Sequence, residues 1–278
     1  MSLSKEIRCL CKKYNIVPLR KRGQNFLIND FFIEKIMVAA ELKKTDMLLE
    51  IGTGPGNLTK VMAQRVKKTI TVEIDKKLAA IAREELKEFK NIEIIQDDIS
   101  SDECFNVFLR QCFNGYKVVA NIPFNLTGLI LRKFLAAEIK PSLMVLITQK
   151  EVGERIIARP PRMSRLAVMV GLYGSAEIVG KISRNNFWPQ PKIDSIILKI
   201  KPFNLKTRQP FDEKHFFKIL NAGFSSPRKY LLNNLIKNAI IDKGEGKKLF
   251  QDLGLSEKIR AQELPVENWV KLSTELAN

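Results

Sequence analysis

Short apolar runs rich in β-branched residues alternate with helical periodicity over residues 47–200. The runs predict strands at 47–51, 69–74, 92–95, 117–120 and 143–148. Helical periodicity follows the first two runs, near 58–66 and 77–89. Apolar strands separated by helices are typical of a parallel sheet that helices cover on both faces. The pattern therefore predicts an α/β, Rossmann-like fold.

The pattern changes in the last third of the chain. Two further apolar runs, at 178–182 and 195–200, have no clear helix between them, which predicts an antiparallel hairpin at one edge of the sheet. Residues 204–210 are polar and lack periodicity, and the segments that follow are helical in pattern. We therefore predict a first domain of residues 1–204, with a basic segment at 1–30, and a small helical domain of residues 205–278.

Charge points to the kind of partner. The 278 residues include 47 Lys and Arg against 30 Asp and Glu, a formal net charge of +17. An excess of this size favours a polyanionic partner, most simply nucleic acid. No apolar run is long enough to cross a bilayer, and the charged N-terminus does not resemble a signal peptide. We expect a cytoplasmic protein that does not bind membranes.

Metal-based and histidine-based chemistry are not favoured by the composition. The four cysteines have neither metal-ligand spacing nor the arrangement of a disulfide framework, and His215 is the one histidine. We expect free thiols, a partly exposed His215 on a helix, and a reaction that needs neither zinc nor imidazole.

A glycine loop follows the first predicted strand and opens a helix. Gly52, Gly54 and Gly56 alternate, and Pro55 lies between the last two. This spacing differs from the dinucleotide fingerprint, and the proline removes an amide that a pyrophosphate cradle would use. The loop suits a ligand without phosphates, such as S-adenosylmethionine. Taken alone, it could also be a simple strand–helix turn.

Acidic residues end the next two strands. Glu73 lies about twenty residues after the glycine loop, where a carboxylate can accept both hydroxyls of a ribose. Asp98 ends the third strand and could accept from the amine of the cofactor's adenine, with Ile74 and Ile99 packing on the ring. Each acid could alternatively be a helix N-cap or a solvated strand end. Suitable groups at three successive strand ends favour a cofactor site.

The fourth strand leads into Asn121, Ile122, Pro123 and Phe124. The exocyclic amine of adenine is a poor nucleophile, because its lone pair is delocalised into the ring. Two acceptors, the Asn121 side-chain oxygen and the Ile122 carbonyl, could grip the amine, and the following proline restrains that carbonyl. Phe124 offers a stacking surface for a base. The alternative is an ordinary turn at a strand end.

These residues together resemble the ribosomal RNA adenine N6-dimethyltransferases, most closely the bacterial small-subunit enzymes, over about residues 18–240. The motifs that carry the resemblance are Lys21–Leu27, Glu50–Gly56, Val72–Asp75, Asp98, Asn121–Phe124, Gln149–Val152, Phe187–Ser195 and Arg228–Leu231. The resemblance implies a Rossmann-like, S-adenosylmethionine-dependent enzyme that dimethylates two adjacent adenines near the 3′ end of 16S rRNA, with a role in ribosome biogenesis. We expect a monomer and a methyl transfer that needs no metal.

The resemblance also implies roles for individual residues. Asn25 and Leu27 close over the cofactor, Gly52 meets its methionine part, and Phe187 clamps the flipped adenine opposite Phe124. Basic side chains are expected to contact RNA: Lys21, Arg22, Arg162, Arg165, Arg228 and Lys229. For Arg162 and Arg165, a solvated surface is the alternative.

The chain departs from the family pattern at two places. Residue 124 is Phe where the family usually has Tyr, and residues 159–165 replace a stretch that often carries a Tyr-Gly pair. Three rivals stay open: a 23S rRNA methyltransferase of the macrolide-resistance type, a DNA adenine methyltransferase, and a non-catalytic rRNA-binding assembly factor. The segment 222–229 resembles the small-subunit enzymes more than the 23S enzymes.

Overall fold

The computed structural model describes residues 2–19, 23–112, 115–122, 126–203 and 212–277. The chain divides into two compact units, one of residues 1–153 with 174–202 and one of residues 154–173 with 203–278. The C-terminal part of the second unit begins close to the predicted boundary near residue 205. That unit also includes residues 154–173, which the sequence had placed in the first domain.

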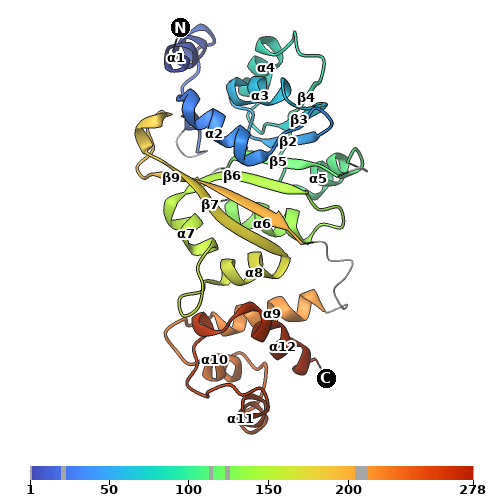
Figure 1. Ribbon diagram of the computed structural model, residues 1–278, viewed down its shortest axis with the longest axis vertical. Coiled ribbons are helices and arrows are strands. Elements are labelled where there is room, and N and C mark those ends of the chain that lie inside the picture. The colour runs from blue at the N-terminus through green and yellow to red at the C-terminus, as the bar shows by residue number, and fades with distance from the viewer. Residues whose placement is uncertain (1, 20–22, 113–114, 123–125, 204–211, 278) are drawn as a thin grey trace. The chain divides into compact units, whose positions relative to one another are not determined.

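A seven-stranded sheet, in the order β4-β3-β2-β5-β6-β9-β7, forms the centre of the first unit (Figure 1). Its strands are β2 (Met47–Ile51), β3 (Lys68–Val72), β4 (Ile92–Ile95), β5 (Lys117–Asn121), β6 (Leu143–Gln149), β7 (Gly174–Ile182) and β9 (Ser195–Pro202). The strands from β4 to β6 are parallel, and β9 pairs antiparallel with both β6 and β7. The predicted parallel sheet and the predicted antiparallel pair at its edge are both confirmed.

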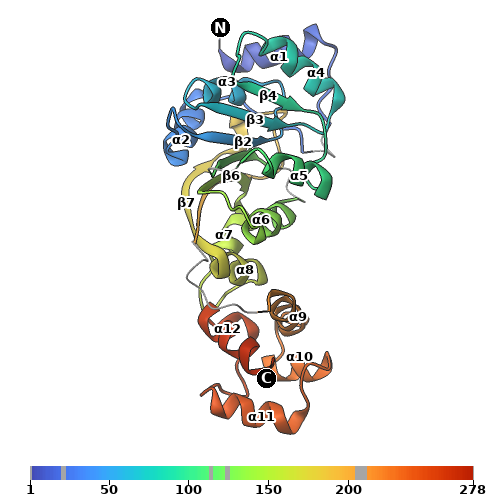
Figure 2. The same ribbon diagram turned by 90° about the vertical axis from the view of Figure 1, so that its right-hand side faces the viewer.

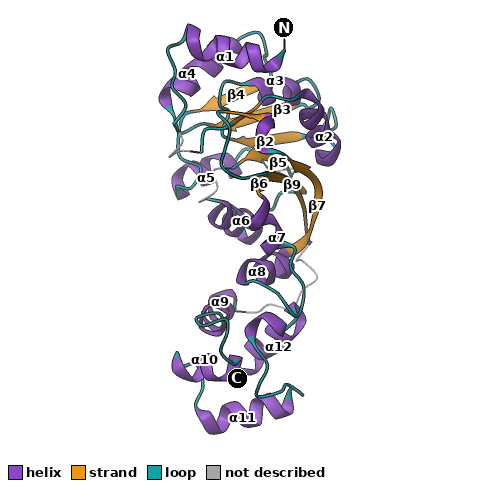
Figure 3. Ribbon diagram, turned by 90° about the vertical axis from the view of Figure 1, so that its left-hand side faces the viewer, coloured by secondary structure: helices purple, strands orange, loops and turns teal. Residues whose placement is uncertain are grey.

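Helices alternate with the parallel strands, as the sequence predicted. Those of the first unit are α1 (Leu3–Lys13), α2 (Asp30–Ala40), α3 (Asn57–Ala63), α4 (Lys76–Glu85), α5 (Asp102–Leu109) and α6 (Thr127–Ala136), and α7 (Lys150–Ile156) follows β6. Helices lie on both faces of the sheet, with α2 and α3 on one side and α5 and α6 on the other (Figure 3). Parallel strands covered on both faces are expected to be apolar throughout, and Val118, Val119 and Ala120 of β5 are fully buried.

Alternate residues of the central strands pack on α2 and α3. Val119 of β5 and Val145 and Ile147 of β6 share one buried cluster with Ile36 of α2 and Met62 of α3. The spacing of two residues puts these strand side chains on one face of the sheet. Because β2 to β6 pair in parallel, their carboxyl ends lie along one edge of the sheet that these helices cover (Figure 2).

A short antiparallel ribbon joins the N-terminal segment to the chain before β9. Its strands are β1 (Phe26–Leu27) and β8 (Phe187–Trp188), in which Phe26 pairs with Trp188 and Leu27 with Phe187. Neither strand was predicted, because a two-residue strand is too short to show periodicity. The ribbon holds the N-terminal segment beside the glycine loop, and Asn57 after that loop donates to the Leu27 carbonyl at 3.2 Å.

The second unit is helical in its described residues. It contains α8 (Arg165–Tyr173), α9 (Glu213–Gly223), α10 (Leu231–Lys237), α11 (Lys243–Asp252) and α12 (Val266–Glu275). Trp269 of α12 is fully buried and stacks on Phe224 at a ring-centroid distance of 5.6 Å. The helical patterns predicted after residue 210 are confirmed by α9 and α10.

Candidate active site

A cavity of about 280 Å³ lies at the carboxyl ends of β2, β3, β4 and β5. Within the sheet, β3 pairs with one edge of β2 and β5 pairs with the other edge. Such a change of direction leaves a crevice beyond the strand ends, which is where open α/β sheets bind ligands. The cavity is lined by residues from the N-terminal segment, the glycine loop and all four strand ends.

The glycine loop has the backbone geometry that its sequence predicts. Gly52, Gly54 and Gly56 have φ angles of 83°, 56° and 89°, in the left-handed region that favours glycine. A Cβ atom on Gly54 would lie 3.0 Å from the ring of Phe26, so the loop also needs the missing side chain. These glycines let the backbone pass close to the cavity without filling it.

Glu73 is held in the cavity wall by two backbone amides. It is 6% exposed, and its Oε2 accepts from the Gly54 amide at 3.0 Å while Oε1 accepts from the Asp75 amide at 2.9 Å. A carboxylate has more lone pairs than two amides use, so it can still accept from a ligand. The acid predicted from its distance to the glycine loop is thereby placed directly against that loop.

Asp98 lies farther along the same edge. Its Oδ1 accepts from the Ser100 amide at 2.8 Å, in a turn that leads to α5. Ile99 is buried, whereas Ile74 is 54% exposed although it is apolar, and both line the cavity. An exposed apolar side chain beside a carboxylate suits a planar, polar-edged ring. The three residues predicted around the cofactor's adenine therefore lie together.

The N-terminal segment forms another wall. Asn25 and Leu27 both line the cavity, as the resemblance implied. Gln24 secures the segment, because its Nε2 donates to Asp75 Oδ2 at 3.1 Å and its Oε1 accepts from the Leu19 amide at 2.7 Å. Asp75 in turn caps α4 through the Lys77 amide at 3.0 Å.

Asn121 contacts the N-terminal segment through its side chain. Its Nδ2 donates to the Asn25 carbonyl at 2.8 Å, and the residue lines the cavity. With the amino group bound in this way, the side-chain oxygen is the part of the amide left to accept. Ile122 is buried, and its amide donates to the Ile147 carbonyl at 3.2 Å, which extends the pairing of β5 with β6.

Glu50, the first residue of the Glu50–Gly56 motif, is a further member of the site that was not predicted as a site residue. It is 1% exposed and lines the cavity, and its Oε2 accepts from Thr59 at 2.6 Å and from Thr71 at 2.8 Å. Among the described residues, its Oε1 is buried without a hydrogen-bond partner. Burial raises the pKa of Glu50 to about 8. The sequence signal that could have identified Glu50 is its position as a carboxylate inside an otherwise apolar strand.

The structure places other predicted residues away from the cavity or leaves them undescribed. Phe187 is 3% exposed, packs in the core cluster with Leu27 and Ile197, and does not line this cavity. Its pairing in β8 explains this burial. Pro123, Phe124, Lys21 and Arg22 lie outside the described residues.

The remaining predicted RNA contacts belong to the second unit. Arg162, Arg165, Arg228 and Lys229 are all exposed. Arg165 donates to Asn221 Oδ1 at 2.8 Å, which ties the start of α8 to α9. Exposed cations of this kind are available to phosphates.

Comparison with known proteins decides the family. The profile of the ribosomal RNA adenine dimethylases matches residues 19–278. The chain belongs to this family. It is 35% identical to the ribosomal RNA small subunit methyltransferase A of Dehalococcoides mccartyi, over 98% of this chain and 92% of the relative. The enzyme of the same name from Clostridium botulinum is also 35% identical, over 95% of this chain and 96% of the relative.

Two solved structures support the same assignment. A dimethyladenosine transferase from Plasmodium falciparum has a TM-score of 0.76 and 26% identity, covering 90% of this chain and 96% of that chain. The 23S rRNA methyltransferase ErmE has a TM-score of 0.69 and 25% identity, covering 91% of this chain and 100% of that chain. The predicted Rossmann-like methyltransferase fold is confirmed.

Membership of the dimethylase family confirms the enzyme class and the cofactor predicted from the sequence. The chain is an S-adenosylmethionine-dependent rRNA adenine dimethyltransferase. The residues around the cavity fit that cofactor, because the left-handed glycine loop, the amide-held Glu73 and the exposed Ile74 offer backbone, carboxylate and apolar contacts side by side. No helix in the described part of the chain is both long and apolar enough to span a membrane.

Proposed function

We propose that this enzyme dimethylates the N6 amines of two adjacent adenines near the 3′ end of 16S rRNA, in the small ribosomal subunit or its precursor. The observation that carries the proposal is the bond from Asn121 Nδ2 to the Asn25 carbonyl at 2.8 Å. This bond leaves the side-chain oxygen of Asn121 as an acceptor at the cavity, where an adenine amine needs one. The 35% identity to enzymes named for the small subunit supports the choice of 16S rRNA.

The cofactor is proposed to lie along the strand ends. Glu73 would accept from the ribose hydroxyls, Asp98 from the adenine amine, and Ile74 and Ile99 would pack on the ring. Gly52, Gly54, Asn25 and Leu27 would enclose the methionine part. Glu50 would accept from its amino group, since its Oε1 is buried without a partner among the described residues and a bound ammonium would stabilise the ionised carboxylate.

Asn121 and the Ile122 carbonyl are proposed to orient the target amine. When bound, the cofactor supplies a methyl group activated by its sulfonium. The acceptors hold the two amine hydrogens, which brings the nitrogen lone pair out of the base plane and toward the methyl carbon. Most of the rate enhancement then comes from positioning and from the exclusion of water. No strong base is needed, because the amine becomes acidic once it is methylated.

The target adenine must leave its stack to reach the cavity. Phe124 is proposed to stack on the flipped base, and Phe187 is proposed to clamp the base from the opposite side. The phosphates of the RNA are proposed to contact Lys21, Arg22, Arg162, Arg165, Arg228 and Lys229. Binding would therefore weaken as salt increases.

Mass spectrometry of rRNA tests the proposal directly. Small-subunit rRNA from a host that lacks this protein should lack dimethyladenine at adjacent positions, and restoring the protein should restore both modifications. A separate assay on purified small and large subunits tests the alternative of a 23S rRNA enzyme, which the similarity to ErmE favours. Methylation of the large subunit alone would overturn the 16S proposal.

We also propose that the protein is monomeric and cytoplasmic and that it has a role in ribosome biogenesis.

A further inference from the structure

We propose that Lys133 is a positioning residue that fixes the adenine end of the cofactor site. It would do so by tying the helix after β5 to the turn that carries Asp98. The inference rests on the proposed contact between Asp98 and the cofactor's adenine. Lys133 does not line the cavity, so it would act through the turn rather than by touching the ligand.

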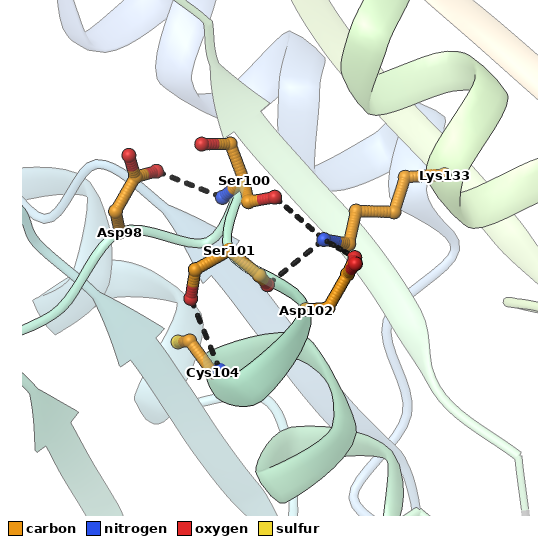
Figure 4. A network of polar contacts seen from close by, with 6 residues as sticks. All are labelled: Asp98, Ser100, Ser101, Asp102, Cys104 and Lys133. Atoms are coloured by element: carbon orange, nitrogen blue, oxygen red, sulfur yellow. Dashed lines mark hydrogen bonds and ion pairs between the residues drawn. The ribbon is translucent and has the colours of Figure 1, made fainter.

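Lys133 lies in the last turn of α6 and bonds to three oxygens at the start of α5 (Figure 4). Its Nζ donates to the Ser100 carbonyl at 2.6 Å, to the Ser101 carbonyl at 2.8 Å and to Asp102 Oδ1 at 2.8 Å. An ammonium has three donors, so the three bonds use its whole capacity. Lys133 therefore grips two consecutive peptide carbonyls as well as a side chain.

The same two residues hold Asp98 from the other side of the turn. The Ser100 amide donates to Asp98 Oδ1 at 2.8 Å, and the Ser101 amide donates to the Asp98 carbonyl at 2.9 Å. Ser101 also caps α5, because its Oγ accepts from the Cys104 amide at 3.1 Å. The amides of Ser100 and Ser101 thus face Asp98, and their carbonyls face Lys133. A shift of these peptides would move the Asp98 carboxylate directly.

The hydrogen bonds of Lys133 connect two parts of the fold that are far apart in the strand order. Asp98 follows β4, which lies beyond β3 on one side of β2, whereas α6 follows β5 on the other side. The bond therefore joins two elements that flank the crevice from opposite halves of the sheet. α6 begins at Thr127, six residues after Asn121 at the end of β5, so the helix that holds Lys133 also follows the strand that carries Asn121.

The burial of Lys133 separates it from ordinary surface lysines. Its side chain is 10% exposed, compared with 60% for Lys87 and 58% for Lys13, which also form ion pairs. Its Nζ lies 5.0 Å from the ring of Phe105, which itself packs edge-on against Phe134 at 4.9 Å. Its charge-assisted bonds to the Ser100 and Ser101 carbonyls are partly buried and therefore stronger than those of exposed pairs, whereas Asp102 is 95% exposed and contributes less. The lysine is therefore held in one place and can fix its partners.

Binding of two ligands to full-length variants tests the proposal. The ligands are S-adenosylhomocysteine and the same compound without its purine 6-amino group, each titrated by calorimetry. The wild-type protein should prefer the amino compound by about tenfold, because a hydrogen bond to a carboxylate discriminates on this scale. Lys133→Met should bind the amino compound about fivefold more weakly and the other compound almost unchanged, which reduces the preference to about twofold. A merely structural defect would weaken both ligands equally.

Three further variants complete the test. Lys117→Met is the matched control, since Lys117 is 12% exposed and pairs with Asp46 at the opposite end of the sheet, and it should keep the roughly tenfold preference of the wild type. Lys133→Arg, which retains donors and charge, should recover most of the preference. If Lys133→Met does not fold, Lys133→Gln takes its place, because a single amide donor should preserve only part of the preference. Asp98→Ala should abolish it.

The outcomes separate this proposal from the one on which it rests. If the wild type shows no preference, or Asp98→Ala retains it, the proposed contact between Asp98 and the cofactor's adenine is wrong. The inference about Lys133 then fails with it. If the wild type discriminates and Asp98→Ala does not, but Lys133→Met and Lys133→Gln discriminate like the wild type, only the inference about Lys133 is overturned. Loss of the preference in Lys117→Met would overturn it as well, because the effect would then be a general one.

Discussion

The two ends of the parallel sheet hold their polar groups in opposite ways. At the amino end, Lys117 pairs with Asp46 at 2.8 Å and also donates to the Glu41 carbonyl. Lys199 reaches Glu41 Oε1 at 2.6 Å at the same end. Here carboxylates meet ammonium groups, and the charges are neutralised within the chain.

At the carboxyl end, the polar groups are held mainly by backbone and hydroxyl donors. Glu73 accepts from two amides, Glu50 accepts from two threonines, and Asn121 donates to a carbonyl. No ammonium group of the described residues forms an ion pair with Glu50. Groups held in this way keep acceptor capacity that a ligand can use.

The comparison shows how a fold separates stability from binding. Ion pairs at the amino end stabilise the folded chain but leave little for a ligand to contact. Buried acceptors at the carboxyl end cost stability, and a bound ligand can recover that cost. Substitutions at the two ends are therefore expected to change different quantities.

Replacing Asn121 by alanine should have the largest effect on the reaction. Loss of the acceptor for the target amine should lower turnover by about a thousandfold, on the order of 4 kcal/mol, because positioning is lost at the reacting atoms. Affinity for S-adenosylmethionine should change far less. Transfer of tritiated methyl groups to small-subunit rRNA measures turnover, and calorimetry measures affinity.

The matched control for Asn121 lies at the amino end of β4. Asn91 Nδ2 donates to the Ala63 carbonyl at 2.8 Å and to the Val66 carbonyl at 3.2 Å. Asn91→Ala should lower the free energy of unfolding by about 1 kcal/mol and leave turnover unchanged. Full activity in Asn121→Ala would refute its assignment as the amine acceptor.

Replacing Glu73 by alanine should act on cofactor affinity. The ligand would lose a carboxylate acceptor, and affinity should fall about thirtyfold to a hundredfold, roughly 2–3 kcal/mol. Asp46→Ala, which removes a carboxylate at the amino end, should leave affinity unchanged while lowering stability. Calorimetry with S-adenosylmethionine decides the matter, and equal affinity in wild type and Glu73→Ala would remove Glu73 from the site.

Replacing Glu50 by glutamine should weaken binding and change how stability depends on pH. Burial raises the pKa of Glu50 to about 8, above its ordinary value near 4.5, so the folded state holds a proton that the unfolded state loses. Between these pH values the wild type should therefore lose stability as pH rises. Glu50→Gln should remove this loss, which is on the order of 4 kcal/mol at pH 8, and should bind the cofactor more weakly.

Chemical denaturation at pH 5 and pH 8 measures the effect of Glu50→Gln on stability. The amino end provides the contrast, because the hydrogen bond from Lys199 lowers the pKa of Glu41. That contribution is present at neutral pH and is lost as pH falls below the ordinary value, which is the opposite trend. A Glu50→Gln variant with the same stability difference from wild type at both pH values would contradict the pKa assignment.

Replacing Gly54 by alanine should have a smaller effect on affinity, about fivefold to tenfold, or roughly 1 kcal/mol. The new Cβ would lie 3.0 Å from the ring of Phe26, which must move against the cavity. Gly115 is the control, since its φ of 84° imposes the same left-handed strain, but a Cβ there meets no described atom within 4 Å. Both variants should lose about 1 kcal/mol of stability, and only Gly54→Ala should lose affinity.

Replacing Lys117 by methionine should have the smallest effect on function. Removing its ion pair should lower the free energy of unfolding by about 1 kcal/mol, since partly buried pairs contribute more than exposed ones. Affinity for S-adenosylhomocysteine should equal that of the wild type. Weaker binding in this variant would show that the two ends of the sheet are coupled, and the comparison would fail.

Several parts of the site could be predicted from the sequence because strand ends determine them. In a parallel sheet, residues that end successive strands must meet at one edge, so Gly52, Glu73, Asp98 and Asn121 had to lie near one another. Alternation of apolar runs and helical periodicity was sufficient for the fold class. These strands and helices are long enough for their hydrophobic periodicity to be recognised in the sequence.

What the sequence determined by itself was the α/β order of the first unit, the edge of the sheet that carries the polar groups, and the residue types at that edge. Only the tertiary structure decided that Phe187 is buried, that Asn121 donates to Asn25, that one Glu50 oxygen has no partner in the described part of the chain, and that Lys133 bonds to the turn after Asp98. Each of these depends on side-chain contacts between residues that are far apart in the chain. Periodicity reports which face a residue occupies, whereas the choice of a distant partner depends on how the elements pack.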